Sequence, residues 1–372
     1  MVDKPNLVRP EVQRLSAYNS GLTIGEVQQR YAPEKISKLG SNENPLGPSP
    51  AVTAALVDYV AAPHLYPDPA GRALRHALAA KHGVAAERII LGNGSEDLLS
   101  VICRTVLRPD DRMVTLYPSF PLHEDYCTVM GAEVVRVPLT ADLTINVDAF
   151  IARIAAGPRL VMFANPMNPA GAWLEPEALR RVIAAVPSGT LLVIDEAYAE
   201  YAYGDDYLEA TDALASVDGD WIVLRTFSKA WGLAGLRIGY GVVSDAILTS
   251  FLDCVRTPFN TNGAAQAAAL AALGDISHIE DVVALAKTER DRVQQALTQA
   301  GYRTVTSKGN FLFFDTAGSS TAIGEALLAQ GVIVKPWKQD GYQSFVRVSI
   351  GTPAENDHFL AALATTRTMT TA

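Results

Sequence analysis

The sequence is poor in cysteine, and its three cysteines, Cys103, Cys127 and Cys254, lie far apart. An odd number at such spacing fits neither a disulfide framework nor a Cys-x-x-Cys metal site, so we expect no metal and a reducing, cytoplasmic location. The first residues lack the apolar core of a signal peptide. The longest apolar segment, residues 264–273, is too short to cross a bilayer, so no membrane partner is expected.

Basic residues are also in the minority, with 31 Lys and Arg against 40 Asp and Glu, a net charge of -9. Nonspecific nucleic-acid binding depends on clustered Lys and Arg, so no nucleic-acid partner is expected. A complete Gly-x-Gly-x-x-Gly segment is missing too, because residues 92–97 read Gly-Asn-Gly-Ser-Glu-Asp. Its absence argues against a nicotinamide dehydrogenase.

What the chain does have is ample core material, since 49% of its residues are hydrophobic. Short apolar segments alternate with helical patterns over residues 51–257, which predicts a large α/β domain with a mostly parallel sheet flanked by helices. Long helical patterns followed by short strands predict a smaller α+β domain at 258–372, ending in a frayed polar tail from residue 365. The Pro-rich residues 1–50 are expected to form an N-terminal arm and substrate loop that packs with the small domain. The expected strands are 88–91, 113–116, 133–137, 160–164, 191–194, 221–224, 237–243, 303–306, 310–315, 332–335 and 345–349.

Residues 225–241, RTFSKAWGLAGLRIGYG, follow one of the apolar strands. They place Lys229 between the hydroxyls of Thr226 and Ser228, with Arg237 close by in sequence. A lysine among phosphate donors suggests pyridoxal phosphate, whose aldehyde forms a Schiff base with the amine and whose phosphate the donors hold. Taken alone, this segment favours a simpler interpretation, a surface lysine in a glycine-rich turn.

Polar residues at other strand ends favour the cofactor. Asp195 directly follows the strand at 191–194, where a carboxylate is costly to bury without a partner and a protonated pyridine nitrogen would supply one. Tyr198 and Asn168 could donate to the ring hydroxyl, and Phe120 offers an apolar face for stacking. Ligands of open α/β sheets lie at the carboxyl ends of the strands, so we expect these residues in one site.

A phosphate site is predicted where a strand, a Gly-rich turn and a helix succeed one another at residues 88–107. The backbone N–H groups of Ser95 and Glu96 at such a junction point at an anion. Together with Thr226, Ser228 and Arg237 they would hold the cofactor phosphate.

The order and spacing of these segments resemble the fold-type I pyridoxal-phosphate-dependent aminotransferases, most closely the histidinol-phosphate aminotransferases. The similarity covers nearly the whole chain through SNENPLGPSP, YPDP, GNGSED, NPMNPAG, DEAYAEY, RTFSKAWGLAGLRIGYG and FVRVSIGT. It implies that Lys229 is the Schiff-base lysine and proton shuttle, and that Arg347 binds the substrate α-carboxylate beside the loop of Asn44 and Gly47. It also implies a homodimer, because Tyr66 is expected to reach the phosphate of the neighbouring subunit's cofactor.

The implied reaction is ping-pong transamination from L-histidinol phosphate to 2-oxoglutarate, giving imidazole acetol phosphate and glutamate in histidine biosynthesis. The chain departs from the family where the substrate phosphate should bind. Tyr18 remains in residues 17–22, but the prolines and lysine usual there are missing, and Lys335 stands where many members have an arginine.

Three alternatives stay open. Trp337, Tyr342 and Phe259 could line a pocket for an aromatic side chain, which would make the protein an aromatic amino-acid transaminase. The same fold also supports cofactor-dependent lyases and decarboxylases. A non-catalytic cofactor-binding module is the third alternative, although the presence of both Lys229 and Arg347 argues against it.

Overall fold

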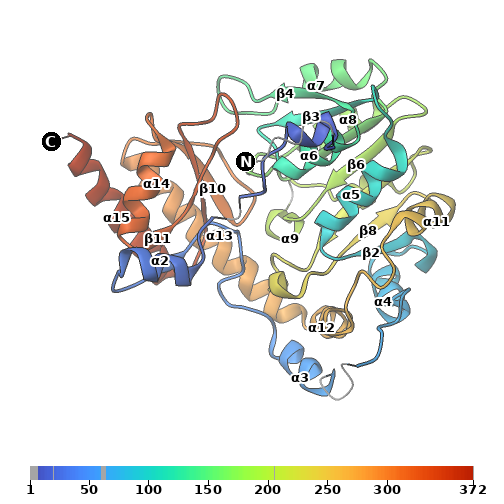
Figure 1. The fold of residues 1–372 in the computed structure, drawn as a ribbon, viewed down its shortest axis with the longest axis horizontal. Helices are drawn as coiled ribbons and strands as arrows, with labels where there is room; N and C mark the ends of the chain where they lie inside the picture. Colours follow the sequence, from blue (N-terminus) through green and yellow to red (C-terminus); the bar gives the residue numbers. More distant parts are fainter. Residues whose placement is uncertain (1–6, 20, 60–63, 205, 372) are drawn as a thin grey trace.

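The computed structural model describes residues 7–19, 21–59, 64–204 and 206–371, with side chains up to residue 366 (Figure 1). A seven-stranded sheet of order β2-β8-β7-β6-β5-β3-β4 forms the centre of the large domain. β8 is antiparallel to β2 and β7, whereas the other pairs are parallel, so the predicted mostly parallel α/β sheet is confirmed. The strands are β2 (Ile89–Gly92), β3 (Arg112–Tyr117), β4 (Glu133–Pro138), β5 (Leu160–Ala164), β6 (Leu191–Asp195), β7 (Trp221–Thr226) and β8 (Gly239–Val243).

Helices cover both faces of this sheet because its central strands are apolar on both sides. In β5, for example, Leu160 and Met162 pack on one face while Val161 and Phe163 pack on the other. The first face carries α5 (Ser95–Val106), α6 (Pro121–Val129) and α11 (Ala246–Val255). The second carries α4 (Arg72–His82), α7 (Val147–Ile154), α8 (Pro176–Ala184) and α12 (Gly263–Leu273).

The small domain is built on an antiparallel sheet of order β12-β13-β10-β9. Its strands are β9 (Arg303–Thr304), β10 (Phe311–Asp315), β12 (Lys335–Pro336) and β13 (Phe345–Ser349), covered by α14 (Ser320–Ala329) and α15 (Pro353–Thr371). In the N-terminal arm, β1 (Ser37–Lys38) pairs with β11 (Val332–Ile333), which brings the arm beside this domain. The expected frayed tail is wrong, because α15 continues to Thr371 through a segment without Gly or Pro to end it.

The packing changes within α13 (Ile276–Gln299), not at the expected boundary between residues 257 and 258. α12 packs against α4 and α3 (Pro50–Tyr59). Val282 of α13 belongs to the cluster on the second face of the large sheet, which extends to Phe311 and Phe345 of the small domain. Val293 and Leu297, further along α13, belong to the small-domain core. The sequence pattern changes near residue 258 because the last strand of the large sheet has ended by then. The helix α13 contributes residues to the cores of both domains.

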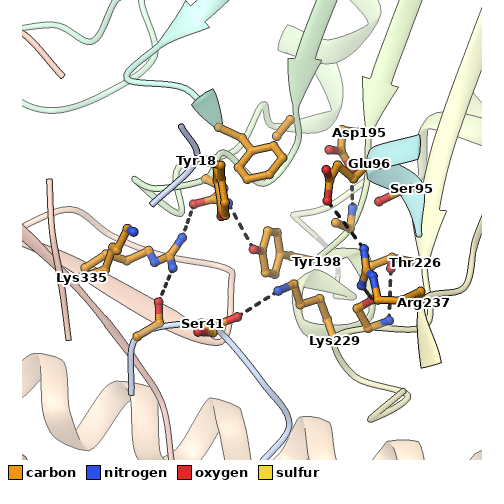
Figure 2. A pocket seen from close by; sticks show the side chains of 17 residues that line it. Tyr18, Ser41, Ser95, Glu96, Asp195, Tyr198, Thr226, Lys229, Arg237 and Lys335 are labelled. Carbon is orange, nitrogen blue, oxygen red and sulfur yellow. Dashed lines mark hydrogen bonds and ion pairs between the residues drawn. The ribbon is translucent and has the colours of Figure 1, made fainter. Parts of the chain in front are cut away.

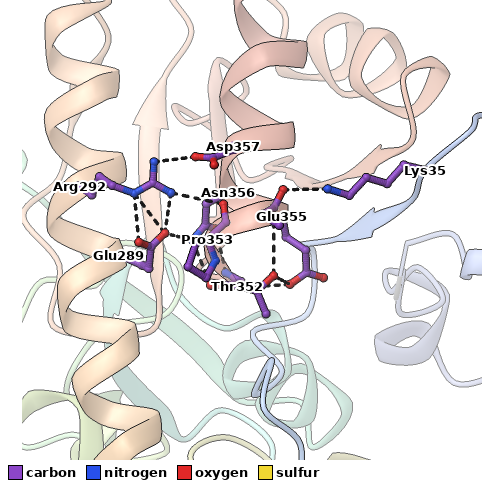
Figure 3. A network of polar contacts seen from close by, with 10 residues as sticks. Lys35, Glu289, Arg292, Thr352, Pro353, Glu355, Asn356 and Asp357 are labelled. Atoms are coloured by element: carbon purple, nitrogen blue, oxygen red, sulfur yellow. Dashed lines mark hydrogen bonds and ion pairs between the residues drawn. The ribbon is translucent and has the colours of Figure 1, made fainter.

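Polar contacts tie α15 to α13 on one side and to the N-terminal arm on the other (Figure 3). Arg292 forms ion pairs with Glu289 at 2.6 Å and with Asp357 at 2.7 Å, and Asn356 Nδ2 donates to Glu289. Lys35 Nζ donates to the carbonyl of Ala354, 2.9 Å away. These contacts hold the start of α15 between α13 and the N-terminal arm. Among the described residues, no helix combines the length and apolar character needed to cross a membrane.

Candidate active site

A cavity of about 310 Å³ opens where β5, β6 and β7 end, and most of the predicted site residues line it (Figure 2). The carboxyl ends of parallel strands lie at the same edge of the sheet, so the polar residues that follow them meet there although they are far apart in sequence. The predicted residues in its wall are Tyr18, Ser95, Glu96, Phe120, Asn168, Asp195, Tyr198, Thr226, Ser228, Lys229, Arg237, Lys335 and Arg347. Sequence reasoning did not identify Gly40 and Ser41, which also line it.

Lys229 stands in the turn after β7, with its amine inside the cavity. Its Nζ donates to the carbonyl of Ser41 at 3.0 Å and lies 5.7 Å from the centre of the Tyr198 ring. The pKa of Lys229 is lowered to about 7, chiefly by removal from water and next by the positive charge of Arg347, which Glu43 partly offsets. A substantial fraction of this amine is therefore unprotonated near neutral pH, as a nucleophile requires.

An anion cradle lies at the N-terminus of α5. No side chain caps this helix, so the first backbone N–H groups remain available to an anion. Gly94 precedes the helix at φ +82°, and a Cβ there would lie 2.5 Å from Arg237 Nη2. Arg237 Nη1 approaches Ser228 Oγ at 3.5 Å, and the Ser228 amide donates to Thr226 Oγ1 at 3.1 Å. An uncapped helix start, hydroxyls and a guanidinium fit the phosphate of pyridoxal phosphate.

Glu96 is the second residue of α5, so its backbone N–H belongs to the cradle, and its side chain adds a carboxylate. That carboxylate pairs with Arg237 at 3.6 Å and accepts from Tyr126 Oη at 3.1 Å. Arg237 adopts φ +59°, an uncommon conformation for a non-glycine residue, which turns the chain back into the cradle.

Asp195 ends β6, and its Oδ2 lies 3.0 Å from His123 Nε2. Its other oxygen accepts from the Ala197 amide at 3.1 Å. Sequence reasoning missed His123, which is buried in α6. The signal that could have found it is its spacing of three residues from Phe120, which places both on the same side of the helix start.

A second polar group surrounds Tyr198. Its hydroxyl accepts from Asn168 Nδ2 at 3.3 Å and from Asn42 Nδ2, another residue missed from sequence, at 3.0 Å. Arg347 donates to Asn168 Oδ1 at 2.6 Å and to the Gly40 carbonyl at 2.7 Å. Among the described residues Arg347 Nε has no hydrogen-bond partner, although it is buried. Such a donor is suited to a ligand anion.

The substrate side of the cavity opens into an outer cavity of about 720 Å³, and the two share Tyr18, Phe120, Lys335 and Arg347. Lys335 faces Arg347 across the β12–β13 pair, and its amine lies 5.9 Å from the Tyr18 ring centre and donates to the Asn19 carbonyl. Burial lowers the pKa of Lys335 to about 8, and the charge of Arg347 adds to the effect. Two cations therefore stand side by side at this wall.

Three predicted residues lie outside the cavity. Asn44 Nδ2 donates to the carbonyls of Gly47 and Ala230, and the Gly47 carbonyl is also 3.0 Å from His278 Nε2. Asn44 and Gly47 thus brace the loop, while Gly40 and Ser41 reach the cavity instead. Tyr66 is 82% exposed and stacks on Phe259, with ring centres 4.5 Å apart. Its place in a neighbouring subunit's site stays a prediction.

Several known proteins are similar to this chain over nearly its whole length. The family model "Aminotransferase class I and II" matches residues 34–363. Histidinol-phosphate aminotransferase 1 of Mesorhizobium japonicum is 62% identical over 96% of this chain and 98% of its own length. Histidinol-phosphate aminotransferase 3 of Rhizobium meliloti is 56% identical, covering 96% of each chain. The crystal structure of histidinol-phosphate aminotransferase from Sinorhizobium meliloti in complex with pyridoxal-5'-phosphate superposes with a TM-score of 0.88, at 29% identity and 98% coverage of both chains.

Proposed function

Because this chain belongs to the class I and class II aminotransferases, we propose that it transfers the amino group of L-histidinol phosphate to 2-oxoglutarate. The products are imidazole acetol phosphate and glutamate, and the reaction belongs to histidine biosynthesis. The observation that carries the proposal is one cavity lined by an amine of lowered pKa, an anion cradle and a pair of cations. Near-complete coverage by relatives named for this activity supports the choice of donor.

The cofactor is pyridoxal 5'-phosphate, and this chain offers groups for each of its parts. When bound, it supplies an aldehyde that takes up an amine and a pyridinium ring that accepts the electron pair released at the substrate Cα. Asp195, backed by His123 at 3.0 Å, is suited to hold the proton on the ring nitrogen. Asn168 and Tyr198 are suited to the ring hydroxyl and Phe120 to its face, while the cradle at Ser95 and Arg237 receives the phosphate.

Lys229 is the residue that moves the proton. With a pKa of about 7, its amine is available near neutral pH to accept a proton from the substrate Cα and to release it again. The Ser41 carbonyl accepts a hydrogen bond from this amine at 3.0 Å and so orients it. The same residues serve both half-reactions, so ping-pong kinetics are expected.

Arg347 and Lys335 are proposed to bind the substrate anion. Histidinol phosphate carries a phosphate ester where glutamate and 2-oxoglutarate carry the α-carboxylate, so one site must accept both groups. Arg347 suits either as a bidentate donor, and Lys335 adds a second charge that matches the extra charge of a phosphate.

An aromatic amino-acid donor is the second candidate, because Tyr18, Tyr117, Phe120 and Trp337 line the outer cavity. Half-reactions followed by the visible band of the cofactor separate the two. Histidinol phosphate should react at least tenfold more efficiently than phenylalanine or tyrosine. The reverse order would make the aromatic reading correct, and no response to any amino donor, including glutamate, would exclude transamination. Release of carbon dioxide without a keto product would indicate a decarboxylase.

The proposal also covers the oligomeric state of the protein and its location in the cell. The protein is a homodimer in which Tyr66 contacts the neighbouring subunit's cofactor, which its exposure and its distance from the subunit's own site support. It works in the cytoplasm, which the three free cysteines support.

A further inference from the structure

Gln339 lies in the segment that follows β12 in the small domain. Its side chain crosses to the large domain, where it meets the loop between β3 and α6. Gln339 Oε1 accepts from the Ser119 amide at 3.0 Å and from Trp337 Nε1 at 2.9 Å. Both partners are N–H donors without acceptor capacity, so hydrogen bonding itself determines which end of the amide is the oxygen.

The other end of the same amide faces acceptors. Gln339 Nε2 donates to Ser119 Oγ at 3.4 Å and approaches Glu124 Oε1 at 3.5 Å. Glu124 is buried and paired with Arg136 at 2.6 Å, so it is a fixed, charged acceptor. One side chain thus connects the two domains through both of its ends.

The two groups that Gln339 connects each adjoin a residue of the cavity wall. Ser119 is the residue before Phe120, which lines the cofactor cavity. Trp337 is buried, and its ring lies 5.8 Å from the guanidinium carbon of Arg347. A cation at that distance is attracted to the face of the ring, which stabilises the guanidinium beside Trp337. The chain of contacts therefore runs from the Phe120 loop through Gln339 and Trp337 to Arg347.

We propose that Gln339 is a positioning residue that sets the placement of Arg347 relative to the cofactor cavity and thereby the affinity for the substrate anion. This inference rests on the proposed function in one respect, the assignment of Arg347 to the substrate anion. Both half-reactions use that arginine, so Gln339 acts on the binding of donor and acceptor alike. Gln339 contacts neither Lys229 nor Asp195 in the described structure, so its removal should change substrate binding more than the proton transfer at Lys229.

The test compares Gln339→Met with the wild-type holoenzyme. Methionine keeps the length and volume of the side chain and removes its amide hydrogen bonds. The control is Gln343→Met, which makes the same change at an exposed amide bonded at 3.3 Å to Asp340. Calorimetry measures the Kd of maleate, a dicarboxylate with no amino or keto group, and half-reactions give KM and kcat for histidinol phosphate and glutamate.

In Gln339→Met we expect the maleate Kd and both KM values to rise about tenfold, equivalent to about 1.4 kcal/mol, with kcat within a factor of about two. Gln343→Met should match the wild type. Trp337→Phe removes the indole N–H that donates to Gln339 and reduces the ring beside Arg347, and it should raise the same Kd several-fold. This variant replaces Gln339→Met in the test if Gln339→Met does not fold.

Unchanged maleate affinity in Gln339→Met, with or without a lower melting temperature, would overturn the proposal, because it would reduce Gln339 to a structural contact. A fall in kcat with unchanged KM would overturn it too. If the wild type reacts with glutamate but not with histidinol phosphate, the proposed donor is wrong, and the maleate and glutamate measurements still decide the role of Gln339.

Discussion

At the scale of single residues, burial decides the chemistry of the two lysines in the site. Both are largely removed from water, and both stand near Arg347, so their pKa values fall to about 7 for Lys229 and about 8 for Lys335. Removal of a charged amine from water costs free energy, and the cost appears as easier loss of the proton. The sequence predicted the lysines, but the shifts depend on neighbours brought by other strands.

Replacing Lys229 by methionine should abolish transamination, with kcat reduced by at least about 10³-fold because the proton carrier is lost. The same variant reports on the stability of the cofactor-free protein. Between pH 7 and 10.5 the unfolded lysine binds a proton that the folded one does not, so its destabilising effect shrinks as pH rises through this window. Denaturant unfolding should show Lys229→Met more stable than wild type at pH 7, with a smaller difference at pH 9.5. A pH-independent difference would contradict the buried-amine explanation.

Lys335 should make substrate affinity depend on pH. Above its pKa of about 8 the side chain loses its charge and attracts a phosphate less strongly. We expect the KM for histidinol phosphate to rise between pH 7 and 9 in the wild type and to rise less in Lys335→Arg, whose guanidinium keeps its charge. Parallel pH profiles of the two proteins would show that Lys335 does not contact the phosphate.

At the scale of elements, the start of α5 and the turn after β7 form the cradle because glycines let their backbones lie close to neighbouring segments. A Cβ on Gly239 would lie 2.3 Å from the Ser95 amide nitrogen, and one on Gly94 would collide with Arg237. Glycines in the sequence indicated close approach, as a Gly-rich turn before a helix usually does. Their partners could not be predicted, because they come from strands that are neighbours only in the folded sheet.

Gly94→Ala should weaken cofactor binding at least tenfold, since its Cβ displaces Arg237 and its backbone is strained at φ +82°. Titration of the cofactor-free protein with pyridoxal phosphate, followed by tryptophan fluorescence, measures the Kd. Gly25→Ala in α2 (Ile24–Tyr31) is the matched control, because a Cβ there meets nothing within 4 Å. An unchanged Kd in Gly94→Ala would argue against the cradle as the phosphate site.

At the scale of the whole molecule, two domains share α13 and enclose the site between them. The large sheet supplies Lys229 and Asp195, and the small domain supplies Arg347 and Lys335. Activity therefore depends on contacts between the domains, of which Gln339 is one. In the proposed dimer it also depends on a second subunit.

Mixing two inactive variants tests the dimer. Tyr66→Ala should lose cofactor affinity at the neighbouring site, while Lys229→Ala loses its own. In a mixed dimer one site carries both changes and the other carries neither, so random reassociation should restore about a quarter of wild-type activity. No recovery after confirmed exchange of subunits, or full activity of Tyr66→Ala alone, would show that Tyr66 serves no neighbouring site.

By itself the sequence determined the family, the cofactor and the kind of fold. Short buried strands with polar residues directly after them are local patterns, and they are sufficient for the parallel sheet, for Lys229 and for Asp195. Only the tertiary structure decided which residues meet. His123, Asn42 and Gln339 act through partners more than 70 residues away in sequence. The tertiary structure also shows that α12 packs with the large domain, and that Ser41 lines the cavity whereas Asn44 does not. Contacts between distant strands and domains leave no local pattern in the sequence, so they could not be predicted from it.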